Sequence, residues 1–395
     1  MRQKYILILP DGVSDRKLKQ LGNKTPLEKA RTPNLDFIVK QSIVGSVNTV
    51  PEGMDPGSDV ANLSILGVNP AKYKIGRGAL EALARNIKIK PSQTIFRANF
   101  VVVKDGVMYD HSGGGIKSKE AKALIDYLNK NLNNNIKFFS GVDYRNLCLV
   151  DKIVKVKTTP PHDILSKKYK NYLPQGKDGK FIQEIMFKIK KLIESYSLYK
   201  QGKIKTNMVW LWGDGKTVPV KSFYERYKLK GAIISAVDII KGIGKLLKMD
   251  IIDVPDITAD VDTNYENHAI YALKNIDKYD FIYVHIEAPD EASHKGDPYL
   301  KIKTIEQIDK KILKPLINSR KNFNLILLPD HPTSTRLRKH LHYPVPFLVW
   351  TKNSKVKPKH RYKKFTENIL KGNNLKIDKG YKLLDKIFSL LEEKE

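Results

Sequence analysis

Short apolar runs that end in acidic or histidine residues recur along this chain. Three runs show the pattern, namely residues 5–9 before Asp11, residues 281–286 before Asp290, and residues 324–328 before Asp330 and His331. Runs of this length and composition predict buried strands of a parallel sheet. Ligands bind at the carboxyl ends of the strands in open α/β sheets, so the pattern predicts that these acidic groups meet at one edge.

The apolar pattern differs between the two ends of the chain and its middle. Near the amino terminus, Thr32 and Pro33 predict a helix start, and residues 59–66 predict a helix with Ser58 at or near its first position. Residues 98–103 and 145–150 predict strands among helical stretches at 118–131 and 181–197, and residues 166–205 are rich in lysine. We therefore predict an α/β fold, with a mostly parallel sheet flanked by helices built from residues 1–67 and 262–395. An α+β second domain, residues 68–261, is predicted to be inserted between these parts.

The residues at the predicted edge, together with three others, have side chains that suit metal ions. The full set is Asp11, Ser58, Asp290, His294, Asp330, His331 and His340. Carboxylate and imidazole ligands of this kind fit two divalent cations, and two cations fit phosphoryl transfer. Each member alone has an ordinary interpretation, because an aspartate after a strand often caps a helix and a serine before a helix is often a plain N-cap. The joint pattern favours the metal interpretation.

Composition adds a strong positive charge. The chain has 395 residues and a formal net charge of +29, and its length allows two domains. An excess of base can indicate nucleic-acid binding, but these lysines are spread over the whole chain and no zinc-finger or RNA-binding signature accompanies them. We interpret them as solvated surface lysines and expect no nucleic-acid partner. A positive field also favours capture of a small phosphorylated substrate.

The number of cysteines indicates the redox state of the cellular compartment. Cys148 is the single cysteine and lies in a predicted buried strand, so no intramolecular disulfide and no thiolate metal site can form. This usage is typical of a reducing cytosol. No stretch approaches the length of a membrane span. We predict a cytoplasmic protein with no membrane partner, and leave open whether it forms a homo-oligomer.

Several longer motifs resemble one known family. They are residues 32–36 (TPNLD), 57–67 (GSDVANLSILG), 287–294 (EAPDEASH) and 330–333 (DHPT), with further matches at Arg77-Gly78, Arg97 to Phe100, residues 241–245 and residues 262–265. These residues resemble the alkaline phosphatase superfamily, and within it the archaeal-type cofactor-independent phosphoglycerate mutases and their bacterial relatives. The resemblance runs from Tyr5 to about Val349.

The resemblance implies roles for individual positions. Ser58 resembles a nucleophile that carries the phosphoryl group as phosphoserine. One Mn²⁺ or Mg²⁺ ion is expected at Asp11, Ser58, Asp330 and His331, and a second at Asp290, His294 and His340. The inserted domain is expected to close over the substrate. Candidate substrate-binding residues are Arg77, Arg97, Arg145, His162 and Lys241, each of which has an ordinary surface or structural role as its alternative.

The sequence also departs from the family pattern. Many such mutases carry an Asp-Arg-x-Ala-Gly-Arg-Ile element where residues 110–116 (DHSGGGI) stand here, so both arginines are missing. Arginine is the usual bidentate partner of carboxylate and phosphate, so the change bears on the substrate more than on the chemistry. Tyr343 stands where an aspartate usually precedes Pro-Val-Pro.

Three functions from different classes compete at this stage. The leading one is an isomerase, a 2,3-bisphosphoglycerate-independent phosphoglycerate mutase of glycolysis and gluconeogenesis that interconverts 3-phosphoglycerate and 2-phosphoglycerate. The alternative enzyme is a homoserine kinase-like phosphotransferase of the same superfamily, which would require a nucleotide. A basic nucleic-acid-binding protein would need no metal, and its affinity would fall steeply with salt.

Overall fold

The computed structural model describes residues 3–352 and 360–392. The chain forms two compact units, one made of Met1–Tyr73 and Val220–Glu395 and the other of Lys74–Pro219. The inserted unit is therefore shorter than the predicted 68–261. Residues 220–261 belong with the first unit because the strand β8 (Gly231–Ile234) pairs in parallel with β10 (Phe281–Ile286). A four-residue strand is too short for its apolar pattern to reveal its partner.

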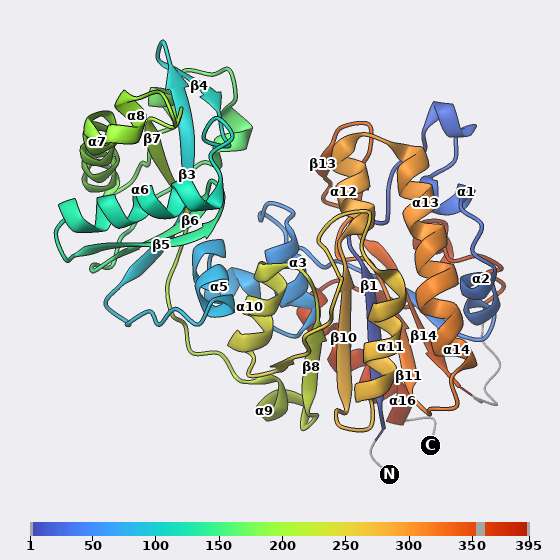
Figure 1. The fold of residues 1–395 in the computed structure, drawn as a ribbon. Coiled ribbons are helices and arrows are strands. Elements are labelled where there is room, and N and C mark those ends of the chain that lie inside the picture. Colours follow the sequence, from blue (N-terminus) through green and yellow to red (C-terminus); the bar gives the residue numbers. More distant parts are fainter. Residues whose placement is uncertain (1–2, 353–359, 393–395) are drawn as a thin grey trace. The chain divides into compact units, whose positions relative to one another are not determined.

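The first unit contains a mixed, mostly parallel sheet of eight strands in the order β15-β2-β14-β11-β1-β10-β8-β9. Its strands come from both ends of the chain, coloured blue and yellow to red in Figure 1. Only β14 runs antiparallel to both of its neighbours. The strands are β1 (Tyr5–Pro10), β2 (Ile43–Val47), β8, β9 (Asp250–Ile251), β10, β11 (Asn324–Leu327), β14 (Val345–Thr351) and β15 (Lys376–Ile377). The predicted fold class is confirmed.

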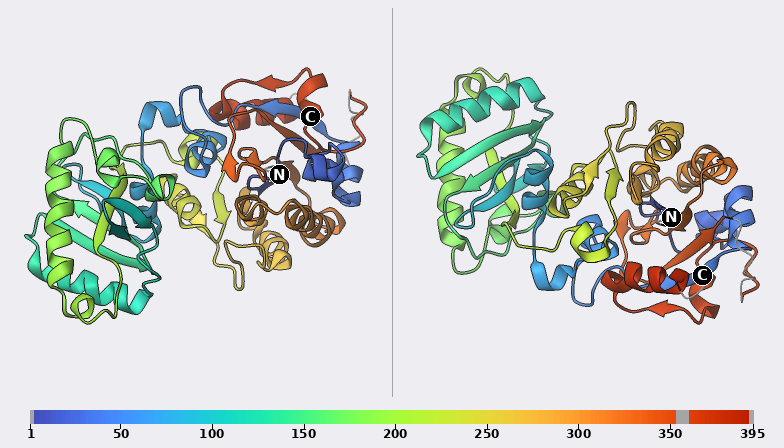
Figure 2. Two further views of the ribbon diagram at one scale, coloured as in Figure 1. Left: turned by 90° about the horizontal axis from the view of Figure 1, so that it is seen from above. Right: turned by 90° about the horizontal axis from the view of Figure 1, so that it is seen from below.

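Helices cover both faces of this sheet. Alternate residues of the central strands, such as Ile6 and Val284, pack in one core with helices on one face. Residues of opposite parity face the other side, where Tyr5 packs its ring on Phe388, with centroids 4.7 Å apart. Figure 2 shows the helices on the two sides of the strands. The first face carries α2 (Pro33–Val39), α11 (Tyr265–Asn275), α13 (Pro298–Ile308) and α14 (Lys314–Asn318), and the second carries α3 (Ser58–Ile65), α10 (Asp238–Leu246) and α16 (Leu383–Glu392).

Shorter elements complete the first unit. Thr32 is the N-cap of α2 and proline occupies its first turn, as predicted. A π-helical turn joins α13 to α14. The remaining elements are η1 (Lys19–Leu21), α1 (Pro26–Lys29), α4 (Pro70–Tyr73), α9 (Phe223–Tyr227), α12 (Ala288–Lys295), η4 (Asp309–Leu313), β12 (Thr333–Ser334), β13 (Lys339–His340), α15 (Ile369–Gly372) and η5 (Gly380–Lys382).

The second unit is α+β, as predicted for the insertion. Its sheet is antiparallel, and β3 (Thr94–Lys104) pairs with three other strands. Cys148 is fully buried in this sheet, and burial raises the pKa of its thiol. The other elements are α5 (Arg77–Ala84), β4 (Val107–Asp110), α6 (Ser118–Asn131), β5 (Ile136–Val142), β6 (Arg145–Val150), η2 (Pro161–Ile164), η3 (Tyr169–Tyr172), α7 (Gly179–Ser195), α8 (Ser197–Lys200) and β7 (Met208–Gly215).

None of the helices in the described part of the chain combines the length and the apolar character needed to cross a membrane.

A buried histidine on α11 is expected to make folding depend on pH. His268 is 1% exposed, and its Nδ1 lies 3.0 Å from the carbonyl oxygen of Asn264. Burial lowers the pKa of this imidazole to about 4. The unfolded chain therefore binds a proton below pH ~6.5 while the folded protein does not until about pH 4. His268 should thus remove about 3 kcal/mol of stability as the pH falls through this window.

Denaturant unfolding of wild type and of His268→Gln between pH 4 and 7.5 measures this contribution. The difference between the two free energies of unfolding should change by about 1.4 kcal/mol per pH unit inside the window, because other groups titrate equally in both proteins. A difference that stays constant with pH would show that the pKa of His268 is the same in the folded and unfolded states.

Candidate active site

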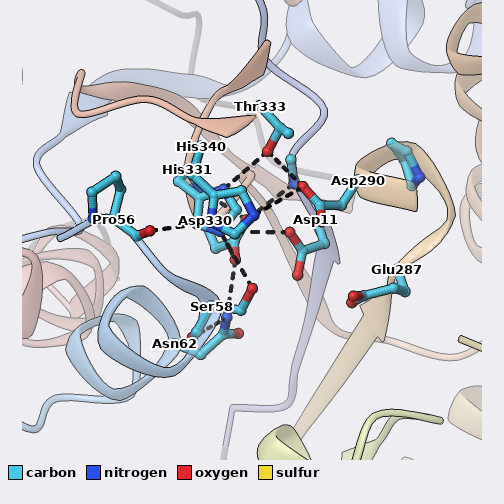
Figure 3. Close-up of polar contacts among 12 residues, drawn as sticks. Asp11, Pro56, Ser58, Asn62, Glu287, Asp290, Asp330, His331, Thr333 and His340 are labelled. Atoms are coloured by element: carbon cyan, nitrogen blue, oxygen red, sulfur yellow. Dashed lines mark hydrogen bonds and ion pairs between the residues drawn. The ribbon is translucent and has the colours of Figure 1, made fainter. Parts of the chain in front are cut away.

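Three neighbouring strands deliver acidic side chains to one edge of the first sheet. β11, β1 and β10 lie side by side in parallel register, with Tyr5 opposite both Phe281 and Asn324. Asp11 follows β1 directly, Asp330 lies just beyond β11, and Asp290 lies in the first turn of α12 after β10. The three carboxylates are at most 3% exposed. The predicted convergence of these three residues at the carboxyl ends of the strands is what the structure shows (Figure 3).

Glycine is required where the first of these loops turns. Gly12 has φ +60°, and a Cβ atom there would lie 2.4 Å from Asp290 Oδ1 and 2.5 Å from Thr333 Oγ1. Its backbone N–H donates to Asp330 Oδ1 over 3.1 Å. The bare backbone thus lets the three loops approach one another closely.

A first group gathers around His331. Ser58 Oγ lies 3.3 Å from His331 Nε2, and this nitrogen is 3.3 Å from Asp330 Oδ2 and 3.9 Å from Asp11 Oδ1. Thr333 Oγ1 lies 2.5 Å from Asp290 Oδ1, which can only accept, and 3.2 Å from His331 Nδ1. The threonine hydroxyl therefore donates to the carboxylate, and His331 Nδ1–H donates to the hydroxyl. His331 Nε2 is left with a lone pair directed at the serine.

A second group gathers around Asp290. Its carboxylate oxygens lie 3.1 Å from His294 Nε2 and 3.6 Å from His340 Nε2, and these two nitrogens are 3.0 Å apart. The Nδ1 atom of each ring faces a backbone carbonyl, Arg338 O for His294 and Pro56 O for His340, at 3.1 Å in both cases. Carbonyls only accept, so Nδ1 carries the hydrogen and both Nε2 lone pairs point at each other beside a carboxylate.

Electrostatics of both groups favour a bound positive charge. Asp11 Oδ1 is buried without a hydrogen-bond partner. Burial and the neighbouring carboxylates Asp330, Glu287 and Asp290 together raise the pKa of Asp11 well above its usual value. Asp290 would accept a hydrogen bond from a protonated Nε2 of His294 and so raises the pKa of that imidazole, which means that a proton is also attracted there. Opposed lone pairs and crowded carboxylates are relieved by cations, and the donor set suits divalent metals.

Ser58 is the first residue of α3, and Gly57 is the N-cap. The simple alternative, a serine at the N-cap position, is not what the structure shows, since Gly57 occupies that position. The hydroxyl is instead turned toward His331 (Figure 3). The sequence pattern predicts the serine at the helix start, but it does not distinguish a hydroxyl that caps the helix from one that is turned toward His331.

A histidine on β10 orients Asp11 and was not among the predicted residues. His285 is 1% exposed, and its Nε2 lies 2.9 Å from Asp11 Oδ2. Its Nδ1 faces Ser235 Oγ at 3.3 Å, and that hydroxyl already accepts from Val237 N–H. Nε2–H therefore donates to the carboxylate, which fixes the ring and the carboxylate together. A lone histidine inside the apolar run 281–286 was the available signal.

Two further polar residues support the serine side of the site. Asn62 Nδ2 donates to Ser58 O over 2.8 Å and to Asp330 Oδ2 over 3.1 Å. Tyr283, buried on β10, donates its hydroxyl to Asn62 Oδ1. These contacts hold the start of α3 against the Asp330 loop. Asn62 lies four residues after Ser58, one turn along the same helix face, so its proximity follows from helical spacing.

Glu287 adds a fourth carboxylate near this edge. Its Oε2 atom is buried without a hydrogen-bond partner and lies 3.6 Å from His285 Nε2. Burial and the charges of Asp290 and Asp330 raise the pKa of Glu287 well above its usual value. This residue increases the negative potential that the two groups already create.

Four of the five predicted substrate-binding residues lie in the second unit. Arg97 lies over the ring of Trp212, 4.2 Å from its centroid, and its Nε is 2.9 Å from Glu81 Oε1. His162 packs edge-on against the same tryptophan, with centroids 5.5 Å apart. Burial lowers the pKa of Arg97, Glu81 opposes this, and the charges of Arg77 and Arg145 lower it further. Arg77, Arg97, Arg145 and His162 therefore form one cationic cluster.

His111 joins this cluster from the element that departs from the family pattern. Its ring packs edge-on against His162 and Tyr144, with centroids 6.3 Å and 6.0 Å apart. Burial lowers the pKa of His162, Asp163 opposes this, and His111 then lowers it further. Lys241 is the candidate that lies elsewhere, in the first unit on α10, a helix that packs against α3.

Comparison with known proteins places the chain in a family. A protein of Methanothrix thermoacetophila named 2,3-bisphosphoglycerate-independent phosphoglycerate mutase is 42% identical over 354 residues, which cover 88% of this chain and 90% of the relative. The chain belongs to the archaeal-type 2,3-bisphosphoglycerate-independent phosphoglycerate mutase family. These enzymes are isomerases. The model of this mutase family also matches residues 39–198.

Other similar proteins match over comparable lengths. A Geobacter sulfurreducens protein named as a probable mutase of this kind is 36% identical over 396 residues, covering 97% of this chain and 98% of the relative. Among solved structures, the cofactor-independent phosphoglycerate mutase of Thermoplasma acidophilum has a TM-score of 0.67 at 25% identity, covering 98% of this chain and 99% of that one. A protein of Pyrococcus horikoshii reaches a TM-score of 0.82 at 26% identity, covering 100% and 99%.

Proposed function

We propose that this chain is a phosphoglycerate mutase that interconverts 3-phosphoglycerate and 2-phosphoglycerate through a phosphoserine at Ser58. The observation that carries the proposal is Ser58 Oγ, 3.3 Å from the unprotonated Nε2 of His331 within a cluster of carboxylates and imidazoles. The names of the relatives at 36–42% identity support the substrate class. Nothing in the structure or the comparisons favours the homoserine kinase-like alternative over this one.

The two groups of ligands fit two divalent cations, Mn²⁺ or Mg²⁺. Asp11, Ser58, Asp330 and His331 would hold one ion, and Asp290, His294 and His340 the other. Bound cations supply positive charge that favours the serine alkoxide and neutralises the phosphoryl oxygens. Support comes from the orphaned Asp11 Oδ1 and from the opposed Nε2 lone pairs of His294 and His340.

The residues of the chain then carry out two transfers. Ser58 Oγ loses its proton and attacks phosphorus, the bond from phosphorus to the glycerate oxygen breaks, and that oxygen takes a proton. The glycerate turns, its other hydroxyl loses a proton and attacks the phosphoserine, and Ser58 is regenerated. Asn62 holds the start of α3 through Ser58 O and Asp330 Oδ2, so the nucleophile stays aligned during both steps.

The cationic cluster of the second unit is the proposed binding site for an anionic group of the substrate. Arg77, Arg97, Arg145, His111 and His162 supply donors, and Arg97 is held in place by Glu81 and Trp212. His111 stands where the family pattern has an arginine, so the neighbouring arginines compensate for the missing charge. Closure of this unit over the substrate, and a role for Lys241, stay predictions.

Removing one cation of the cluster is expected to weaken turnover of 3-phosphoglycerate. Arg145 is exposed and lies over the ring of Tyr144, 5.3 Å from its centroid, so Arg145→Ala should leave folding intact. Losing one charge-assisted contact should lower kcat/KM about tenfold to a hundredfold, mainly through KM. Lys137→Ala is the matched control, because Lys137 is exposed in the same unit and also lies over an aromatic ring, that of Phe139. Equal kinetics for both variants would remove Arg145 from the proposed site.

A coupled enolase assay tests the proposed function directly. The assay uses 3-phosphoglycerate and Mn²⁺, without nucleotide, and then with ATP and homoserine. We expect 2-phosphoglycerate formation that does not depend on ATP. Absence of mutase activity together with ATP-dependent phosphorylation of homoserine would instead establish the kinase.

A further inference from the structure

A fully buried lysine lies beneath the ligand cluster and has no part in the proposed chemistry. Lys301, on α13, is 0% exposed. Its Nζ donates to Thr333 O over 2.8 Å and to Ser14 O over 3.2 Å, and lies 3.4 Å from Asp15 Oδ2. A buried ammonium has a large desolvation cost unless it is paired and hydrogen-bonded, and here all three of its donors have partners.

The partners of this lysine belong to the loops that carry the ligands. Ser14 and Asp15 continue the loop that starts with Asp11, and Thr333 lies two residues after His331. Lys301 lies near the start of α13, which follows closely after α12, the helix that carries Asp290 and His294. Asp297, between the two helices, is the N-cap of α13 and accepts from two of its backbone N–H groups. One ammonium group therefore joins all three ligand-bearing segments.

Asp15 extends the same connection. Its Oδ2 atom accepts from the backbone N–H of Thr335 over 3.0 Å and from the Thr335 hydroxyl. Its own N–H donates to Glu367 Oε1 over 3.0 Å. Ser14 O also accepts from Thr333 N–H over 2.9 Å, so the two loops are bonded to each other through backbone as well as through side chains.

The connection reaches the ligands through Thr333. The Thr333 carbonyl accepts from Lys301. Its hydroxyl donates to Asp290 Oδ1 and accepts from His331 Nδ1–H. Asp290 and His331 belong to different proposed metal groups, so Thr333 contacts both groups. In Figure 3 Thr333 lies next to both Asp290 and the two stacked imidazoles. A shift of the Thr333 backbone would move both contacts together.

We propose that Lys301 is a positioning residue that, through Thr333 and Asp15, sets the separation of the two metal groups. The proposal rests on the proposed function in treating these groups as a two-cation centre. The competing explanation is an ordinary buried ion pair that contributes only to stability. The two explanations differ in what happens when the charges are removed together.

The test compares Lys301→Met with the double variant Lys301→Met/Asp15→Leu. Lys301→Met leaves Asp15 charged and buried, so it should lower stability whichever explanation holds. The double variant removes both charges and should recover much of that stability. Mn²⁺ affinity of chelator-treated protein is measured by electron paramagnetic resonance of free Mn²⁺, at a temperature at which every variant is folded. Thr335→Val, which removes one hydroxyl bond to Asp15, is a milder third variant should the others fail to fold.

A positioning role predicts Mn²⁺ binding about tenfold or more weaker in the double variant as well as in Lys301→Met, because outer-shell partners of metal ligands typically contribute 10–100-fold. Asp309→Asn is the control. Asp309 is also buried, and it accepts from the N–H groups at the start of α2. Its loss should affect stability and leave Mn²⁺ affinity unchanged.

Wild-type Mn²⁺ affinity in the double variant, or in Thr335→Val if only that variant folds, would overturn the positioning role. Failure of the wild-type protein to bind Mn²⁺ is a separate outcome. It would overturn the proposed two-cation centre, and the positioning role with it.

Discussion

Replacing Ser58 with alanine is expected to abolish phosphoryl transfer while the protein stays folded. The proposed mechanism requires an oxygen at this position, and the hydroxyl that faces His331 Nε2 within the described residues is that of Ser58. Turnover of 3-phosphoglycerate should fall by at least about a thousandfold, comparable to the loss of other covalent nucleophiles. Because Gly57 and not Ser58 is the N-cap, the free energy of unfolding should change by less than about 1 kcal/mol.

The coupled enolase assay and intact-protein mass spectrometry check this result. Wild-type protein quenched during turnover should gain the mass of one phosphoryl group, and Ser58→Ala should not. Ser118→Ala is the control, because Ser118 is also the first residue of a helix, α6, where it hydrogen-bonds Asp143. Near-wild-type turnover by Ser58→Ala would mean that the serine has only a structural role.

Removing divalent metal is expected to have an effect of similar size. Exhaustively chelated protein should lose activity by at least about a thousandfold, and Mn²⁺ or Mg²⁺ should restore it, because two cations carry the charge stabilisation. A cation present at about a hundred times its Kd should also raise the free energy of unfolding by about 2.7 kcal/mol per site. Full activity after complete chelation would rule out the two-cation centre.

Affinity for metal should also fall as the solution becomes acidic. Imidazole must be neutral to ligate, so binding weakens below pH ~6.5. Asp290 would accept a hydrogen bond from a protonated Nε2 of His294 and so raises the pKa of that imidazole, and proton competition at this group therefore begins at a higher pH. Isothermal titration with Mn²⁺ between pH 5.5 and 8 measures the decline. His294→Ala should remove one binding event, whereas His342→Ala should remove none, because His342 is exposed and its Nε2 faces the backbone carbonyl of Pro51.

Much of the secondary structure of both units could be predicted from the apolar pattern alone. The predicted strand at residues 281–286 and the helix at 118–131 coincide with β10 and α6. The first is an apolar run interrupted by a single histidine and the second has helical apolar periodicity, and both have clear boundaries, which is why the pattern suffices. The convergence of Asp11, Asp290 and Asp330 followed from the rule that parallel strands end at one edge.

The domain boundary and the supporting residues could not be predicted in this way. β8 has only four residues, and its place beside β10 depends on tertiary packing that no local pattern encodes. In the sequence, Lys301 resembles a solvated surface lysine, and His285 interrupts an apolar run. Both are buried in the folded protein, and this burial depends on contacts between segments that are distant in sequence. The cationic cluster depends on the antiparallel pairing of β3 with β7, which brings Arg97 opposite Trp212.

The strand order also constrains when the site can exist during synthesis. β1 is made first, yet both of its partners, β10 and β11, begin 276 and 319 residues later, at Phe281 and Asn324 against Tyr5. At ribosomal rates of roughly 5–20 residues per second, the strand that carries Asp11 waits on the order of ten seconds or more without a neighbour. The inserted unit has all its strand partners within 74–219 and can form in that interval. Nascent chains that end before β11 contain Ser58 but lack Asp330 and His331, so the proposed site cannot yet form in them.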